Sequence, residues 1–200
     1  MSKRNLPIWI AVLAALALFW QPRPAYADQI NLSFSPSFDT STLTNQGPFD
    51  LAFVLTDGSG VGDQNTMVTL SNFNFGAGGS GTISSLTTIS DTTFFNSIIS
   101  PFIPGNRLSF SVQIASTSID SPTPDFFEFL ILQPSTGFPI STTDPSGNNF
   151  LIALNLDSAS ATPQVFAPTP VPEPGTLVLL ASGLVLMLLL ARRQMSQRFS

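Results

Sequence analysis

The 200-residue sequence contains no cysteine and no histidine, and its one lysine is Lys3. Without thiolate or imidazole side chains the chain has no disulfide framework, and most zinc, copper and haem sites are excluded. Schiff-base chemistry and Ser–Lys catalysis need a lysine, which the sequence lacks beyond its N-terminal segment. Hydroxyl side chains are abundant, but no histidine or lysine is available to activate them. The composition therefore predicts a protein that is not an enzyme.

Basic residues are almost absent between the two ends of the chain. Arg107 is the one base between residues 28 and 170, against eleven acidic residues, so this part carries about −10. This balance excludes nucleic-acid binding through phosphates and favours attraction of divalent cations. Every aromatic residue in the same part is phenylalanine. Carbohydrate-binding platforms normally use Trp or Tyr, so the composition also counts against a strong lectin.

An N-terminal signal peptide is predicted over residues 1–27. Two basic residues precede an apolar run at 8–20, and Ala25 and Ala27 form a small-x-small cleavage site before Asp28. The alternative is a permanent membrane helix, for which the apolar run is too short.

The last thirty residues combine three elements. They are a motif at 171–176 that contains Pro172, Glu173 and Pro174, an apolar run at 177–191, and a basic tail at 192–200 that begins with Arg192 and Arg193. The prolines cannot continue a helix backwards, and the arginines are costly inside hydrocarbon, so a transmembrane helix is predicted between them. The run is shorter than the ~20 residues of a comfortable span. This length favours a transient membrane anchor that is removed by cleavage.

This combination resembles the PEP-CTERM sorting signal of Gram-negative bacteria. The resemblance implies recognition by an exosortase, a membrane-embedded cysteine transpeptidase that cuts near the motif and passes the protein outward with the secretion machinery. By the resemblance, Pro172, Glu173 and Pro174 form the recognition motif, and Arg192 and Arg193 form the membrane stop. An ordinary tail-anchoring helix after a Pro-rich linker is the alternative.

Residues 28–161 have the pattern of an all-β domain. Apolar residues alternate with polar ones, and Gly-rich or Pro-rich turns, including one at 101–106, separate the apolar segments. A phase change at Ser71-Asn72 predicts a bulge. Strands are predicted at 30–34, 51–55, 67–75, 82–89, 93–99, 108–115, 126–132 and 150–156, with a last short one at 164–167. The expected fold is an antiparallel, jelly-roll-like β-sandwich, followed by a Pro-rich linker at 162–170.

The domain itself resembles a family of uncharacterised PEP-CTERM proteins. The residues that carry the resemblance are at 47–60, 65–66, 70–76 and 94–96, with the pattern GPF…L.DGSG.GD.N…LSNF.FG followed by Phe-Phe-Asn. The resemblance implies an exported protein and brings no known activity.

The loop at 57–65 is a candidate calcium site. Asp57, Ser59, Asp63 and Asn65 place carboxylate, hydroxyl and amide oxygens close together on a Gly-rich segment, and hard Ca²⁺ prefers oxygen ligands. The spacing does not match an EF-hand. The alternative is a long hairpin connection made of residues that tolerate positive φ.

Asp120, Asp125 and Glu128 form a second acidic group. Two carboxyl groups can serve in glycoside hydrolysis, but if both residues lie in the strand, strand parity places Asp125 and Glu128 on opposite faces, which favours a solvated loop edge. Two carboxylates facing each other across a cleft would restore the enzyme hypothesis. The sequence therefore predicts an exported cell-surface or extracellular-matrix protein with a structural or adhesive role linked to exopolysaccharide. The alternative is a calcium-assisted module that binds a glycan or a protein.

Overall fold

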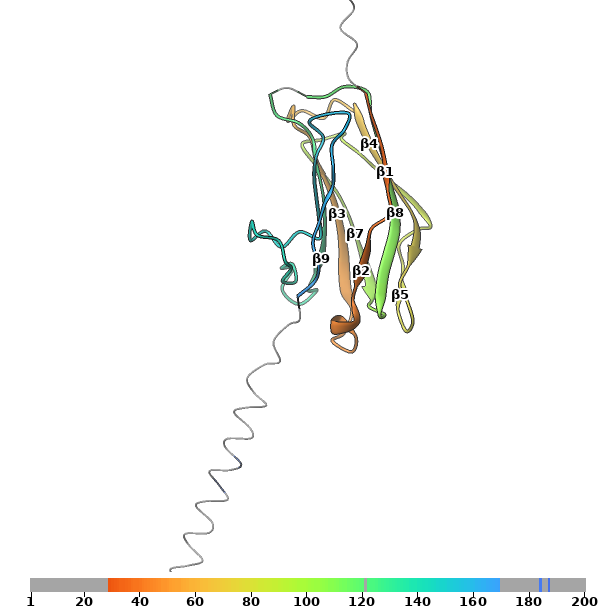
Figure 1. The fold of residues 1–200 in the computed structure, drawn as a ribbon, viewed down its shortest axis with the longest axis vertical. Helices are drawn as coiled ribbons and strands as arrows, with labels where there is room; N and C mark the ends of the chain where they lie inside the picture. Colours follow the sequence, from red (N-terminus) through yellow and green to blue (C-terminus); the bar gives the residue numbers. More distant parts are fainter. Residues whose placement is uncertain (1–28, 121, 170–183, 185–186, 188–200) are drawn as a thin grey trace, which may run out of the picture.

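The computed structural model describes residues 29–120 and 122–169, together with Leu184 and Met187. Two antiparallel sheets pack face to face, which confirms the predicted all-β sandwich (Figure 1). The five-stranded sheet has the order β1-β8-β4-β6, with β2 also paired to β8, and the six-stranded sheet has the order β11-β10-β9-β3-β7-β5. The finer expectation of a jelly-roll order stays a prediction.

Each predicted strand overlaps a strand of the structure, and the short strands β2 and β5 are additional to the predicted ones. The five-stranded sheet contains β1 (Ile30–Phe34), β2 (Ser37–Asp39), β4 (Thr66–Asn74), β6 (Leu86–Ser90) and β8 (Arg107–Ser116). The six-stranded sheet contains β3 (Phe49–Thr56), β5 (Ser80–Gly81), β7 (Phe95–Ile103), β9 (Phe126–Leu132), β10 (Ile152–Asn155) and β11 (Gln164–Val165). A short 3₁₀ helix, Ser41–Leu43, lies between β2 and β3.

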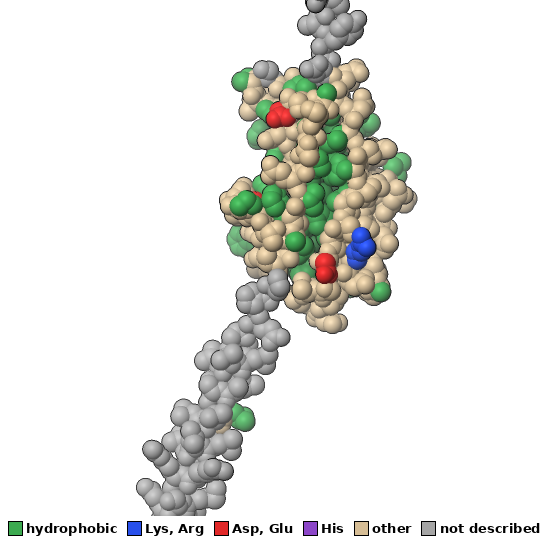
Figure 2. Space-filling view, viewed as in Figure 1, with side chains coloured by type: hydrophobic (Ala, Val, Ile, Leu, Met, Phe, Trp, Pro, Cys, Tyr) green, Lys and Arg blue, Asp and Glu red, His purple; other side chains and the backbone are tan. Residues whose placement is uncertain are grey.

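Phenylalanine rings from both sheets form the centre of the core. Phe53 of β3 stacks on Phe129 of β9 with ring centroids 4.6 Å apart, and it meets Phe110 of β8 edge-on at 5.3 Å. Each of these three residues is at most 2% exposed. The inward residues of β8 alternate with outward polar ones, as the period of two predicts. Figure 2 shows hydrophobic side chains filling the space between the sheets, with few charged side chains around them.

The predicted bulge in β4 is confirmed. The pairing of β4 with β8 shifts between Ser71 and Asn74, and Asn72 has a φ of 55°. An asparagine tolerates this left-handed conformation better than most residues, so the phase change in the sequence marks the bulge correctly.

The turn expected at 101–106 begins later, because β7 continues to Ile103. Pro101 lies inside this strand and opposite Asp50 of β3. On its other side β7 pairs only with the two residues of β5, near the edge of the sheet. A proline is tolerated at such a position because an N–H is not required for the ladder. The strand expected at 82–89 is shorter in the structure, where β6 covers Leu86–Ser90.

The segment at 162–170, expected to be a linker, is attached to the sandwich over most of its length. Gln164 and Val165 pair with β10, Pro168 forms a bridge with Thr142, and the N–H of Thr169 donates to the carbonyl of Ser141. The prolines prevent a continuous strand here, but the remaining backbone groups still add to the edge of the six-stranded sheet.

The first and the last residues of the sandwich lie at its opposite ends. Ile30 pairs with Ser116 at one end, whereas the chain reaches Thr169 at the other (Figure 1). The predicted signal peptide at 1–27 lies outside the described residues, as does the predicted span at 177–191 except for Leu184 and Met187. Within the part of the chain that the structure describes, no helix is both long and apolar enough to cross a membrane.

Candidate functional site

Five aspartates gather at the end of the sandwich where β1 begins, and we call them the carboxylate cluster. Each lies in a loop next to a strand end: Asp57 directly follows β3, Asp63 lies between β3 and β4, Asp91 directly follows β6, and Asp120 and Asp125 lie between β8 and β9. Because neighbouring antiparallel strands alternate in direction, these strand ends meet at the same end of the two sheets.

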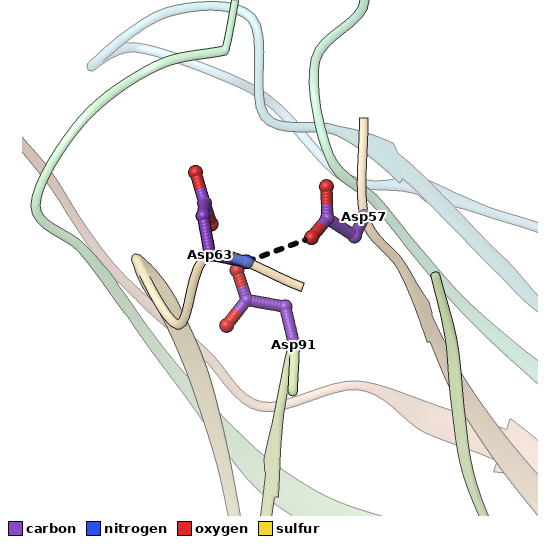
Figure 3. Close-up of side chains that lie close together, drawn as sticks. All are labelled: Asp57, Asp63 and Asp91. Atoms are coloured by element: carbon purple, nitrogen blue, oxygen red, sulfur yellow. Dashed lines mark hydrogen bonds between the residues drawn. The ribbon is translucent and has the colours of Figure 1, made fainter. Parts of the chain in front are cut away.

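Asp57 organises the loop that follows it. One carboxylate oxygen accepts hydrogen bonds from the Ser59 hydroxyl at 2.6 Å and the Gly60 N–H at 2.9 Å. The other accepts from the N–H groups of Gly62 at 2.7 Å and Asp63 at 3.2 Å, the latter drawn in Figure 3. Asp57 is fully buried. A loop of this shape therefore requires a carboxylate at position 57.

The glycines of this loop are required by its backbone. Gly60 and Gly62 have φ values of 80° and 75°, which side-chain-bearing residues rarely adopt. A Cβ on Gly62 would also collide with the carbonyl of Thr92. The loop therefore packs directly against the segment between β6 and β7, which brings Asp63 next to Asp91.

Asp120 and Asp125 approach the same loop from the connection between β8 and β9. Asp125 accepts a hydrogen bond from the N–H of Gly58 at 2.7 Å, and Asp120 accepts one from the N–H of Ser59 at 3.1 Å. Asp125 is buried and Asp120 is half-buried. The two loops are thus joined by carboxylate-to-backbone contacts across 61 to 67 residues of sequence.

Asn65 joins two members of the cluster. Its side-chain amide donates to Asp63 and to Asp120, each at 2.8 Å. Asp91 is fully buried and accepts from the N–H of Thr66 at 3.1 Å. Every carboxylate of the cluster therefore accepts at least one hydrogen bond, and each is held in a defined position.

The carboxylate oxygens lie close enough for several to share one ion. Asp57, Asp63 and Asp91 place oxygens within 4.8 Å of one another, and so do Asp57, Asp120 and Asp125. The side chains of the first group converge in Figure 3. Asp57 is common to both groups and lies at the centre of the cluster.

The pKa values show the electrostatic consequence of this crowding. Burial, together with the contact with Asp63 and the charge of Asp125, raises the pKa of Asp91 to about 6, although the hydrogen bond from Thr66 lowers it. Burial also raises the pKa of Asp120, aided by the charges of Asp125 and Asp63. Burial opposes the charged form of Asp57 too, but its hydrogen bonds outweigh burial and lower its pKa.

No basic side chain of the described residues offsets these charges nearby. Arg107 is the one base between residues 29 and 169, and it lies at the start of β8, in register with Asp39. The cluster adjoins the other end of this ten-residue strand, ~30 Å away by strand geometry. Ca²⁺ takes six to eight oxygen ligands from carboxylates, carbonyls and water, so the donor set fits this ion.

The predicted calcium ligands lie together, but in different roles. Asp63 is exposed and available, whereas the oxygens of Asp57 bind the N–H groups of its own loop. Ser59 donates its hydroxyl to Asp57, and Asn65 presents its amide N–H groups to the cluster. Sequence reasoning missed Asp91 as a member and separated Asp120 and Asp125 from this loop. The available sequence clue was that Asp91 and Asp125 each adjoin a strand end.

The second acidic group of the sequence is divided between two places. Asp120 and Asp125 belong to the carboxylate cluster, whereas Glu128 lies within β9, opposite Val54 of β3 and Ala153 of β10. Burial raises the pKa of Glu128. Asp125 precedes β9, so the strand-parity argument, which needs both residues in the strand, does not apply to it. The expected solvated loop edge is wrong for Asp125, which is buried.

Comparison with known proteins identifies one feature. Residues 170–194 match the family model of the PEP-CTERM protein-sorting motif. The match covers the predicted Pro172-Glu173-Pro174 motif, the apolar run and the first basic residues of the tail, and it confirms that resemblance. Neither the curated proteins nor the solved structures gave a match to the chain.

Proposed function

We propose that this protein, exported and sorted by an exosortase through its PEP-CTERM motif, is a non-enzymatic component of the cell surface or extracellular matrix. Its role is structural or adhesive, within exopolysaccharide. The observation that carries the proposal is the sorting motif at 170–194, which follows directly on a β-sandwich that ends at Thr169. The motif indicates an exosortase-sorted exported protein, and the sandwich is the part that would be delivered.

The composition of the sandwich supports a non-enzymatic role. Between residues 29 and 169 the chain has no histidine, cysteine or lysine, and one arginine. The buried carboxylates of Asp57 and Asp125 accept backbone N–H groups and hold loops in place. These hydrogen bonds assign the two carboxylates a structural role in holding the loops together.

Replacement of Pro172, Glu173 and Pro174 by alanines tests the sorting step. In a bacterium with an exosortase, the wild-type protein should reach the outer or extracellular fraction with a shortened C-terminus. The triple variant should stay in the inner membrane with its C-terminus intact, because the recognition motif is lost. Fractionation with intact-mass spectrometry measures both properties.

The matched control places three alanines in an exposed turn of the sandwich, at Pro134, Ser135 and Thr136. This variant should be sorted like the wild type. If the motif variant and the control show the same distribution and the same mass, the exosortase part of the proposal is wrong.

A second candidate function is that of a calcium-assisted binding module. The observation that favours it is the carboxylate cluster, in which two sets of three carboxylates place oxygens within 4.8 Å of one another. At neutral pH these side chains repel one another, and a divalent cation among them would relieve the repulsion. Asp63, which is exposed and held by the N–H groups of Asn65, is the side chain best placed to turn toward an ion.

Calcium should raise the melting temperature of the full-length protein. Extracellular calcium sites bind at 10⁻⁴ to 10⁻³ M, so about 10 mM CaCl₂ is a suitable concentration. Saturation at 100 times Kd would add about 2.7 kcal/mol to the free energy of unfolding. The double variant Asp63→Asn/Asp120→Asn should lose most of this increase, whereas Asp50→Asn, at the opposite end of β3 from Asp57, should keep it.

Sodium chloride of equal ionic strength separates ion binding from screening. It should raise the melting temperature far less than calcium, because screening acts weakly on buried charges. An equal shift with sodium, or no shift with calcium, would remove the calcium module from consideration.

A further inference from the structure

The outer faces of the two sheets differ in chemistry. On the five-stranded sheet, outward positions of β1, β8, β4 and β6 form two rows across the strands that contain no charged residue, and we call these rows the uncharged face; Arg107 lies at an outward position at the other end of β8. One row is Ser33, Gln113, Thr69 and Thr88, and the other is Asn31, Ala115, Met67 and Ser90. The outward side of the six-stranded sheet instead carries Asp50 and Glu128, and apolar residues such as Ile99. In a domain of about −10, an uncharged face across four strands is a distinct surface.

A hollow lies in the middle of this uncharged face. It has a volume of ≈ 340 Å³, within the range of ~300–1,000 Å³ typical of small-molecule sites. Its side-chain walls are Asn31, Ser33, Met67, Thr69, Gln113 and Ala115. Ala115 is directly flanked by Asn31 on β1 and Met67 on β4. Its methyl group is shorter than either neighbour, so the floor of the hollow lies between two longer side chains.

The polar groups of the hollow are free to bind a ligand. Among the residues that the structure describes, the side chains of Asn31, Thr69 and Gln113 have no hydrogen-bond partner, although hydroxyl and amide groups elsewhere on the domain have many. Asn31 and Gln113 are exposed, and each offers both a donor and an acceptor. Two amides and two hydroxyls thus surround the apolar surface of Ala115 and Met67.

We propose that this hollow binds a neutral polysaccharide. A sugar ring presents hydroxyl groups that both donate and accept hydrogen bonds, and these match the amides and hydroxyls of the walls. The C–H groups of the ring can pack on Ala115 and Met67. An anionic polymer gains no cation here and is repelled by the net charge of the domain. Met67 and Ala115 offer less apolar surface than the Trp and Tyr rings of other carbohydrate sites, so the binding is expected to be weak, in agreement with a composition that counts against a strong lectin.

The proposal deepens the proposed function and rests on its matrix role, since it names the polymer class and the surface that would hold it. Binding is measured on purified protein and sorting is measured in cells, so one can fail while the other holds.

The test uses the full-length protein in mild detergent, titrated with dextran, mannan and galactan as neutral probes and alginate as an acidic one. At least one neutral polymer should bind, and alginate should not. Asn31→Ala and Gln113→Ala should each weaken the binding about threefold to tenfold, the effect of removing a hydrogen-bonding group. Ala115→Phe should abolish it by filling the hollow. Unchanged melting temperatures establish that these variants are folded.

Asn155→Ala and Gln164→Ala are matched controls, because they remove exposed amides from β10 and β11 of the other sheet. Both should bind like the wild type. The proposal is wrong if none of the neutral polymers binds, if alginate binds equally well, or if Ala115→Phe leaves the affinity unchanged. A change of oligomeric state in Ala115→Phe, seen by sedimentation, would assign the face to a second copy of the chain and also overturn the proposal.

Discussion

Asp91→Asn is expected to raise the melting temperature of the full-length protein at pH 7 without calcium, and to leave it almost unchanged at pH 3.5. Burial, with the neighbouring carboxyl groups of Asp63 and Asp125, raises the pKa of Asp91 to about 6, whereas an unfolded aspartate titrates near 3.8. Below the unfolded pKa, Asp91 is protonated in both states and contributes no penalty. As the pH rises through the folded pKa, the folded state must ionise a buried group, and stability is lost.

Asparagine removes this penalty and keeps the hydrogen bond. Its side-chain oxygen can still accept from the N–H of Thr66, and its amide can donate to Asp63. We expect a gain of about 1 to 2 kcal/mol at pH 7, less than a full shift of two pKa units would give, because the neighbouring carboxyl groups share the effect. Thermal unfolding between pH 3.5 and 8 measures the difference between the variant and the wild type.

Calcium should reverse the order of the melting temperatures, so that the wild type becomes more stable than Asp91→Asn. An ion among the carboxylates removes the penalty in the wild type, whereas the variant has lost a ligand and gains less.

Asp144→Asn is the control for the measurement at pH 7 without calcium. Hydrogen bonds lower the pKa of Asp144 despite burial, so a neutral side chain at this position should be destabilising at pH 7. A lower melting temperature for Asp91→Asn at pH 7 would contradict this description of the cluster.

Phe53→Ala is expected to destabilise the protein by about 3 to 5 kcal/mol, the usual result of removing a buried ring. Phe53 is at 0% exposure and contacts rings from both sheets, with Phe129 at 4.6 Å and Phe110 at 5.3 Å. The cavity would lie where the sheets are held together, and a centre made of rigid rings cannot collapse to fill it. Urea unfolding followed by circular dichroism measures the loss.

Phe138→Ala is the matched control, because the same ring at this position is 71% exposed. It should change stability by less than about 0.5 kcal/mol. Similar losses for the two variants would contradict the placement of the core between the sheets.

Strands such as β8 could be predicted from the sequence because their apolar side chains are buried on one face and alternate with residues on the other. The alternation at 108–115 and the phase change at Ser71-Asn72 both correspond to the structure. The almost continuous apolar sequence of β9 is typical of a strand that is buried on both faces, but in this strand only Phe127, Phe129 and Ile131 are fully buried. Outward apolar residues in this strand cannot be told apart from inward ones by composition alone.

The carboxylate cluster could be predicted only in part. The loop at 57–65 carries its own evidence, because closely spaced Asp, Gly and Ser residues show that its oxygens lie near one another. Asp91 and Asp125 are separated from Asp57 by 34 and 68 residues, and no periodic pattern connects them. Their approach depends on which strands pair, and pairing is a property of the whole sheet. The hollow on the five-stranded sheet could not be predicted for the same reason, since Asn31 of β1 and Met67 of β4 come together because both strands pair with β8 at Ala115.

The two ends of the sandwich carry different features. Thr169 leads toward the sorting motif, and the carboxylate cluster lies at the far end, close to Ile30 (Figure 1). A cell that holds this protein by its C-terminal segment would present the aspartates outward, toward the medium. The cluster is about one ten-residue strand, ~30 Å, from the end of the sandwich at which the protein would be held. That distance is several Debye lengths of about 8 Å, so charges at the point of attachment would be screened from the aspartates, and the ions of the medium would determine their charge state.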